Sequence, residues 1–177
     1  TSSNPGVSAD YSSVFFASDK ESELNFDIYA MDKNGANKVR MTQTENSDSI
    51  NRDEFSPVES SEGRIYYIYG KNLYSMASSG GDSREELAFD GKNIKFPDVV
   101  ITETSRKIAF VSNRNSFSNY ELYVADLDST GKIISPDTLT PHTVSSGNDD
   151  YYPKFSKDAK YLVFFRKDSS GKGNIFK

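Results

Sequence analysis

Ile108-Ala109-Phe110-Val111 and Glu121-Leu122-Tyr123 form one copy of a pattern that the chain repeats four times. The first part is an apolar run, and the second is an acid or Asn followed by an apolar residue and an aromatic ring. The other apolar runs begin at Val14, Ile65 and Leu162, and the other second parts begin at Asp27, Asn72 and Asn174. Successive second parts lie 45, 49 and 53 residues apart. Such runs indicate strands, and a repeat of this length is typical of a radial β array.

Each copy is expected to form one blade of four antiparallel strands in an all-β propeller. The whole chain, 1–177, is then a single domain with repeats at about 5–44, 53–90, 97–143 and 153–177. The first strand of each repeat is expected to begin at Pro5, Asp53, Pro97 or Pro153, because a proline at a strand start breaks no ladder hydrogen bond. The apolar run forms the second strand, and the second part opens the third. Weaker fourth strands are expected near 38–42, 85–89 and 137–140.

The apolar runs are continuous rather than alternating, which indicates strands that are covered on both faces. Blades that are sandwiched between two neighbours provide this cover. The fourth copy reaches Lys177 inside its third strand. Either the ring closes with a three-stranded blade or these four blades are part of a larger propeller. We favour the second reading, because an open array would leave an unpaired strand edge and an apolar blade face in water.

Composition excludes several classes of function. The net charge is -5 and the pI is about 5.0, with no stripe of Lys and Arg, so we expect no nucleic-acid partner. The absence of Cys excludes disulfides, zinc-thiolate sites and a Cys nucleophile. No run approaches the ~18 apolar residues of a membrane span. The hydrophobic fraction of 35% is low, but 11 Tyr and 12 Phe argue against disorder.

No residue set points to catalysis, a metal or a cofactor. His142 is the single histidine, so it lacks the partners that a metal or catalytic site needs. The segment from Asp126 to Gly131 is similar to the opening of a calcium loop, but its twelfth position is Asp137 rather than Glu, which favours an ordinary turn. The chain contains neither a Gly-x-Ser-x-Gly elbow nor a phosphate-binding loop. We therefore predict that the chain is not an enzyme.

The candidate binding residues lie in an acidic cluster that recurs at the same place in two repeats: Asn148, Asp149, Asp150, Tyr151, Arg52 and Asp53. Paired carboxylates can perform acid and base steps in glycosidases, but their recurrence favours a turn role. In an antiparallel blade, the connections between strands two and three lie on the same face as the links between blades. The long connections fall mostly on that face, which makes it a candidate partner site. Charge reversal at Asp149 and Asp150 is therefore expected to weaken binding more than changes at Lys33 and Asn34.

The turns before two of the apolar runs have related sequences: Ser8-Ala9-Asp10-Tyr11 before Val14, and Ser156-Lys157-Asp158-Ala159 before Leu162. With the runs that follow, they are similar to Ser-Pro-Asp-Gly-x-x-Ile-x-Phe-x-Ser-Asp, the repeat pattern of the TolB-type (WD40-like) β-propeller family. The third copy, from Ile108 to Asp126, resembles it most closely. Tyr11 and Ala159 depart from the pattern, since both stand where the family has a turn glycine.

This resemblance implies a non-catalytic scaffold of the bacterial cell envelope, either periplasmic or at the cell surface. Its partner would be another envelope protein or a peptide or glycan ligand. The resemblance also leaves open the substrate-gating propeller of a prolyl-oligopeptidase-like peptidase, whose catalytic domain would lie outside this chain. A third reading is a small carbohydrate-active propeller.

Overall fold

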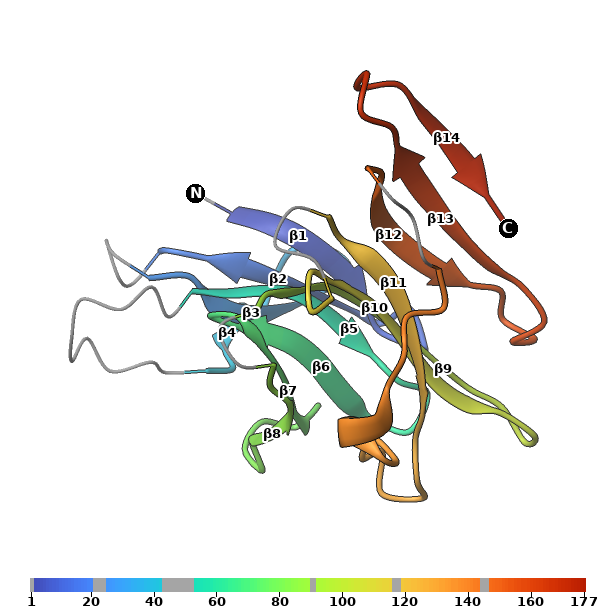
Figure 1. The fold of residues 1–177 in the computed structure, drawn as a ribbon. Coiled ribbons are helices and arrows are strands. Elements are labelled where there is room, and N and C mark those ends of the chain that lie inside the picture. The colour runs from blue at the N-terminus through green and yellow to red at the C-terminus, as the bar shows by residue number, and fades with distance from the viewer. Residues whose placement is uncertain (1, 21–24, 43–52, 90–91, 116–118, 144–146) are drawn as a thin grey trace.

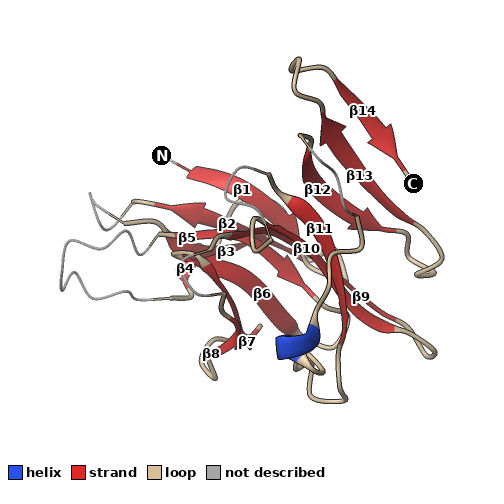
Figure 2. Cartoon of the chain, in the orientation of Figure 1, coloured by secondary structure: helices blue, strands red, loops and turns tan. Residues whose placement is uncertain are grey.

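The structure is a computed structural model that describes residues 2–20, 25–42, 53–89, 92–115, 119–143 and 147–177 (Figure 1). Their regular secondary structure is β-strand, apart from one short 3-10 helix, η1 (Pro136–Thr138) (Figure 2). The prediction of an all-β fold is confirmed. No helix among the described residues has the length and hydropathy that a membrane span requires.

The strands form four antiparallel sheets, which we call blades 1 to 4 in chain order. Blade 1 contains β1 (Ser2–Val7), β2 (Ser13–Ser18), β3 (Asp27–Asp32) and β4 (Val39–Arg40). Blade 2 contains β5 (Glu54–Glu59), β6 (Arg64–Tyr69), β7 (Asn72–Ala77) and β8 (Arg84–Leu87). Blade 3 contains β9 (Ile94–Ile101), β10 (Arg106–Ser112) and β11 (Glu121–Asp126). Blade 4 contains β12 (Asp149–Phe155), β13 (Leu162–Lys167) and β14 (Gly173–Phe176).

One cross-strand aromatic pair recurs at the same place in every blade. It joins the second strand to the third, and its members are Phe16 and Tyr29, Tyr67 and Tyr74, Phe110 and Tyr123, and Phe164 and Phe176. The ring centroids of the four pairs lie 5.8, 6.1, 5.5 and 5.7 Å apart. The four sequence copies are therefore structurally equivalent, with the register that their spacing predicts.

The prediction that first strands begin at Pro5, Pro97 and Pro153 is wrong, whereas the strand predicted to begin at Asp53 begins at the next residue, Glu54. These strands begin at Ser2, Glu54, Ile94 and Asp149, and each carries its proline inside the strand, at an irregularity in the ladder. The equivalent prolines are Pro5, Pro57, Pro97 and Pro153. A bulged residue leaves the ladder, so the missing N–H of proline costs no hydrogen bond there.

The fourth strands agree less well with the sequence prediction than the second and third strands do. Two are present as β4 and β8, but the strand expected at 137–140 is absent from blade 3. Helix η1 and a single bridge between Tyr123 and Pro141 stand in its place. Pro141 has no N–H with which to extend the bridge into a ladder. Blade 4 has three strands among the described residues.

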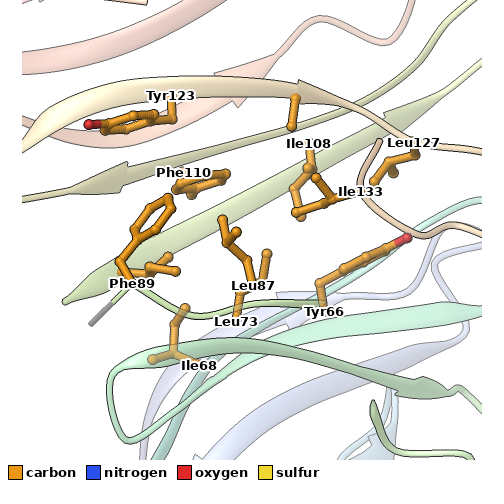
Figure 3. Close-up of a cluster of buried hydrophobic side chains, with 12 residues drawn as sticks. Tyr66, Ile68, Leu73, Leu87, Phe89, Ile108, Phe110, Tyr123, Leu127 and Ile133 are labelled. Atoms are coloured by element: carbon orange, nitrogen blue, oxygen red, sulfur yellow. The ribbon is translucent and has the colours of Figure 1, made fainter. Parts of the chain in front are cut away.

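The core consists of three clusters, one at each boundary between successive blades. The cluster between blades 1 and 2 contains Phe15, Ala17, Ile28, Ile65, Tyr67 and Met76. The largest cluster joins blades 2 and 3, where the stacked rings of Phe110 and Tyr123 lie beside Phe89 and face Leu73 and Leu87 (Figure 3). The cluster between blades 3 and 4 contains Ala109, Val111, Leu122 and Phe164. Blades 2 and 3 are thus covered on both faces, as their continuous apolar runs require.

Candidate functional site

The first strands of all four blades line one groove of about 500 Å³. Its walls are the bulged halves of β1, β5, β9 and β12 and parts of the turns that follow them. This volume lies within the range of ligand pockets, about 300–1,000 Å³. Side chains from four separate repeats therefore converge on one concave surface.

Each first strand is also an edge strand of its sheet. An edge strand presents backbone N–H and C=O groups that can pair with an incoming strand. Each of these four edges is interrupted by a bulge and a proline. Such interruptions prevent continuous strand addition, so the groove is left to side chains and to short stretches of backbone.

Three residues that line the groove have strained backbones. Ser56, Phe96 and Tyr152 have φ angles of 54°, 52° and 51°, and each directly precedes the bulge proline of its strand. A left-handed backbone costs a non-glycine residue about 1–2 kcal/mol. Strain of this kind is concentrated at functional sites, where it fixes the direction of a side chain.

Aromatic residues from different blades, Tyr11, Phe96, Tyr152 and Phe155, take part in the groove lining. Tyr11 and Tyr152 are 58% and 57% exposed, so a ligand in the groove can reach their rings. The ring of Tyr152 lies 4.3 Å from that of Phe96, across the boundary between blades 3 and 4. The Nζ of Lys157 lies 5.0 Å from the centre of the Tyr11 ring, so this pair joins blade 4 to blade 1. Exposed rings and a cation are contacts that a ligand can use.

One buried acid of the groove, Asp98, is already hydrogen-bonded within the chain. Asp98 accepts hydrogen bonds from Lys154 Nζ at 2.6 Å and from the backbone N–H of Phe155 at 2.8 Å. Burial raises the pKa of Asp98, and the Lys154 ammonium opposes that effect. The carboxylate thus links β9 to β12 and gives the wall of the groove its shape.

Two of the sequence-predicted binding residues instead join neighbouring blades. Asp149 Oδ1 accepts a hydrogen bond from Tyr120 N at 2.8 Å, and Asp53 Oδ1 accepts one from Phe26 N at 3.0 Å. In each case the acid lies at the start of one blade and its donor directly precedes the third strand of the blade before. The recurrence of this acid is therefore structural.

Asp150 is fully buried at the boundary between blades 3 and 4. Its carboxylate accepts hydrogen bonds from Arg166 Nε at 2.7 Å, from Arg166 Nη2 at 3.0 Å and from the Thr143 hydroxyl. The same hydroxyl accepts a hydrogen bond from Leu122 N at 3.1 Å. We call this arrangement, in which a threonine hydroxyl joins a third-strand N–H to an acid of the next blade, the threonine clasp.

A second threonine clasp lies between blades 1 and 2. The Thr42 hydroxyl accepts a hydrogen bond from Ile28 N at 2.9 Å and donates one to Glu54. The boundary between blades 2 and 3 has Ala88 and Ile94 at the equivalent positions, so both partners are replaced together. The threonines were missed from the sequence because they lie 12 residues before the acid in one clasp and 7 in the other.

Of the three remaining predicted binding residues, Tyr151 and Asn148 are among the described residues and Arg52 is not. Tyr151 is half-buried, and its ring centroid lies 6.2 Å from that of Phe96 and 6.4 Å from that of Tyr120. Asn148 is half-buried beside it, and Arg52 lies outside the described residues. A binding role for the six residues stays a prediction. The groove residues Tyr11, Phe96, Tyr152 and Lys157 were missed. The available signal for Phe96 and Tyr152 was their place directly before a repeated proline, and Tyr11 and Lys157 lie in the turns that follow the first strands.

The other sequence candidates occupy turns. The Thr130 hydroxyl donates a hydrogen bond to Asp128 Oδ1 at 2.7 Å, and this bond, with those from Lys132 N at 3.0 Å and Thr130 N at 2.8 Å, lowers the pKa of Asp128. This is the turn role that the sequence favoured over a calcium loop. His142 is exposed, and its backbone N–H donates to Leu122 O. Within the described ranges, no group of three or more acids and histidines is placed to hold a metal ion.

Comparison with protein-family models and with curated proteins finds no match. Solved structures do match. A structure assigned as TolB from Agrobacterium tumefaciens superposes with a TM-score of 0.68 at 18% identity, over 94% of this chain and 54% of that one. TolB from Acinetobacter baumannii gives 0.64 at 17% identity, over 99% of this chain and 43% of that one. A puromycin-hydrolyzing peptidase from Mycobacterium tuberculosis gives 0.57 at 12% identity, over all of this chain and 29% of that one.

At these identities the likeness concerns the fold, and the chain spans about half the length of the two TolB structures. The four antiparallel sheets of three or four strands agree with that fold. The chain therefore has the fold of the TolB-type β-propellers, as the resemblance of its repeats implies.

Proposed function

We propose that this chain is a non-catalytic scaffold that binds a peptide segment of another cell-envelope protein, or a glycan, in the groove along the first strands. The observation that carries the proposal is the convergence of exposed and strained aromatic residues from different repeats on one surface. Tyr11 and Tyr152 face solvent there, and the backbone of Tyr152 is held in a left-handed conformation. Aromatic residues of low conformational entropy are the usual anchors of binding sites.

The acids nearest to the groove support binding rather than catalysis. Asp98 accepts a hydrogen bond from Lys154, and Glu59, the other acid of the groove lining, accepts one from the backbone N–H of Ala9 at 3.0 Å, which joins blade 2 to blade 1. A general acid or base needs a carboxyl group that can reach the substrate and exchange a proton with it. Here the carboxylates hold the walls together, and the aromatic rings are the groups that a ligand can reach. We further propose a location in the periplasm or at the cell surface, and the likeness of the fold to TolB structures supports this proposal.

The test is a binding screen against defined arrays of synthetic peptides and of glycans, followed by titration of the strongest ligand. Tyr11→Ala and Tyr152→Ala are expected to weaken binding at least tenfold, because each removes a solvent-exposed ring from the groove. Tyr161→Ala is the matched control, since Tyr161 is a similarly exposed tyrosine (49%) outside the groove lining. Equal binding by the three variants, with unchanged melting temperatures, would contradict the groove as the site.

A second measurement separates binding from catalysis. The protein is incubated with chromogenic aminoacyl and peptide substrates and with acidic oligosaccharides, and product is followed over time. No turnover above the protein-free rate is expected. Turnover that scales with protein concentration and is lost in a groove variant would show an enzyme and refute the scaffold.

The charge-reversal prediction at Asp149 and Asp150 needs a control for stability. Asp150 is buried and paired, so reversing its charge is expected to destabilise blade 4 whether or not it contacts a ligand. Binding by these variants is therefore compared with Lys33 and Asn34 variants at a temperature where all of them remain folded. A loss of binding confined to the acidic pair would support the long-loop face instead of the groove.

A further inference from the structure

A second hollow adjoins the groove at the boundary between blades 1 and 2. It has a volume of about 410 Å³ and lies among the turn from β1 to β2, the turn from β5 to β6 and the residue that follows β7. Ala9, Glu59 and Ser61 line both hollows, so a ligand can reach from one into the other. Six serines contribute to its wall, and we call it the serine pocket: Ser8, Ser12, Ser13, Ser60, Ser61 and Ser78.

Two of the six hydroxyls are available to a ligand. The Ser78 hydroxyl has no hydrogen bond to another described residue, and the Ser13 hydroxyl has one contact among these residues, at 3.4 Å from Ser12 Oγ. Both Ser13 and Ser78 are half-buried, so their side chains belong to the wall of the pocket. The other four hydroxyls bond to groups of the chain. A serine hydroxyl donates one hydrogen bond and accepts two, and it rotates to suit its partner.

Two carboxylates in the pocket wall each have one open oxygen. Asp10 accepts its hydrogen bonds on Oδ1, from Ser8 Oγ at 2.7 Å, Ser12 Oγ at 2.8 Å and Ser12 N at 2.9 Å. Glu59 accepts one on Oε2, from Ala9 N at 3.0 Å. No donor among the described residues bonds to Asp10 Oδ2 or to Glu59 Oε1. The Ser12 N–H and the hydroxyls of Ser8 and Ser12 lower the pKa of Asp10 to about 2, so this carboxylate is charged at neutral pH and acts as an acceptor.

This set of groups matches a sugar better than a peptide or an anion. A sugar hydroxyl both donates and accepts, so it can bond to an open carboxylate oxygen and to a serine hydroxyl at once. An anionic ligand would be repelled by Asp10 and Glu59. An apolar peptide side chain would find little apolar surface, since Phe15 is 3% exposed and the other apolar residues of the lining are Ala9 and Ala30.

We propose that the serine pocket binds one unit of a neutral oligosaccharide, whose next units lie along the groove. This inference rests on the proposed function and narrows it, because it selects a glycan instead of a peptide. Hydroxyls of the bound unit donate to Asp10 Oδ2 and Glu59 Oε1 and accept from Ser13 and Ser78. The next unit packs its C–H face on the ring of Tyr11, which follows Asp10 in the chain and is exposed in the groove.

The first test compares matched pairs of neutral and acidic oligosaccharides. Oligosaccharides of galactose, glucose and mannose are titrated into the chain beside the uronates of the same length and linkage. At least one neutral member is expected to bind, and its uronate is expected to bind at least about tenfold more weakly, because the pocket is negative. Glu59→Gln leaves an oxygen for Ala9 N but removes the charge, so it is expected to narrow that difference at least about threefold. Uronates that bind as tightly as the neutral sugars would overturn the proposal.

The second test uses variants that alter the pocket and leave the groove lining intact. Ser13→Ala and Ser78→Ala are each expected to weaken binding of the neutral oligosaccharide about fivefold, since each removes one hydrogen bond to the ligand. Both serines are absent from the groove lining, and unchanged melting temperatures are expected because neither hydroxyl makes a short hydrogen bond within the described chain. Ser79→Ala is the matched control, because Ser79 is exposed in the same turn as Ser78 and lies outside both linings.

The outcomes separate this inference from the proposed function. If Tyr11→Ala and Tyr152→Ala weaken sugar binding but Ser13→Ala and Ser78→Ala do not, the groove remains the site and the serine pocket is refuted. If peptides bind and no neutral sugar does, the scaffold stands and the glycan is refuted. Binding confined to peptides rich in lysine or arginine would refute it in the same way and show that the carboxylates of the pocket recognise a cation. If neither class binds, both proposals fail.

Discussion

Tyr11 and Ala159 occupy turn positions where the repeat pattern has glycine, yet both turns keep the same conformation. Their φ angles are 61° and 58°, which are left-handed values that glycine adopts without strain. Each turn is held by an acid two residues after a serine: Asp10 accepts from Ser12 N at 2.9 Å, and Asp158 accepts from Lys160 N at 3.2 Å. The side-chain hydrogen bonds maintain the turn, and the non-glycine residue accepts the strain.

Ala159→Gly is therefore expected to raise the free energy of unfolding by about 0.5–1 kcal/mol, because relief of the left-handed strain outweighs the added chain entropy of glycine. Ala9→Gly is the matched control, since Ala9 lies in the equivalent turn of blade 1 and has no positive φ. That variant is expected to lose a few tenths of a kcal/mol or more. Urea denaturation at equal m-values measures both changes. A loss of stability in Ala159→Gly would show that the turn is not strained.

Asp10 gives a prediction about acid. The backbone N–H of Ser12 and the hydroxyls of Ser8 and Ser12 lower the pKa of its carboxyl group to about 2. A carboxyl whose pKa is lower in the folded chain stabilises the fold above its unfolded pKa of 3.8, and that contribution disappears as the pH falls from about 4 to 2. NMR titration of the Asp10 carboxyl carbon is expected to give a midpoint near 2, which rises toward 3.8 in Ser8→Ala. A wild-type midpoint near 3.8 would contradict these hydrogen bonds in solution.

At the scale of strands, the sequence predicts most where side chains decide the outcome. The starts of β3, β7 and β11 at Asp27, Asn72 and Glu121 agree with prediction, because the apolar and aromatic pattern fixes the register. Three of the four first strands were misplaced, because proline was assigned to a strand start and not to a bulge inside the strand. The left-handed backbones of Phe96 and Tyr152 are imposed by these bulges, and no local preference of an aromatic residue indicates them.

The acids at the blade boundaries were recognised as recurrent, but their partners were not. Thr42 and Thr143 lie in connections of different length and meet their acids only in the folded chain. An alignment of the four repeats shows which strands are equivalent. It does not show a clasp, because the threonine of a clasp lies at the end of one repeat and its acid lies at the start of the next. The groove was missed for a related reason, since its aromatic residues come from turns and bulges of separate repeats.

The threonine clasp between blades 1 and 2 gives a prediction at this scale. Thr42→Ala removes the hydroxyl that bonds both Ile28 N and Glu54, so it is expected to cost about 1–3 kcal/mol. Thr42→Ala combined with Glu54→Ile reproduces the Ala88 and Ile94 pair of the next boundary. The double variant is expected to be more stable than the sum of the two single changes predicts, with a coupling of at least about 0.5 kcal/mol. Strict additivity in urea denaturation would show that the threonine and the acid act independently.

For the whole molecule, stability is distributed as in a repeat array, where each blade contributes through its boundaries with its neighbours. The three boundary clusters contain most of the buried aromatic and aliphatic side chains. At each of the three boundaries, an equivalent residue of the third strand packs against the following blade: Ile28, Leu73 or Leu122. Blade 4 presents Ile175 to solvent instead. Among the described residues, the exposure of this third-strand residue therefore shows whether another blade packs on that face of its blade.

Alanine substitution at this position is expected to separate the four blades. Ile28→Ala, Leu73→Ala and Leu122→Ala each leave a cavity in a boundary cluster and are expected to cost about 2–4 kcal/mol. Ile175→Ala removes a side chain that is 78% exposed and is expected to change the free energy of unfolding by less than about 0.5 kcal/mol. Denaturation curves at two protein concentrations measure the series. A cost above 2 kcal/mol for Ile175→Ala that grows with protein concentration would show that blade 4 is covered in solution by another copy, because a buried side chain is costly to remove and an exposed one is not.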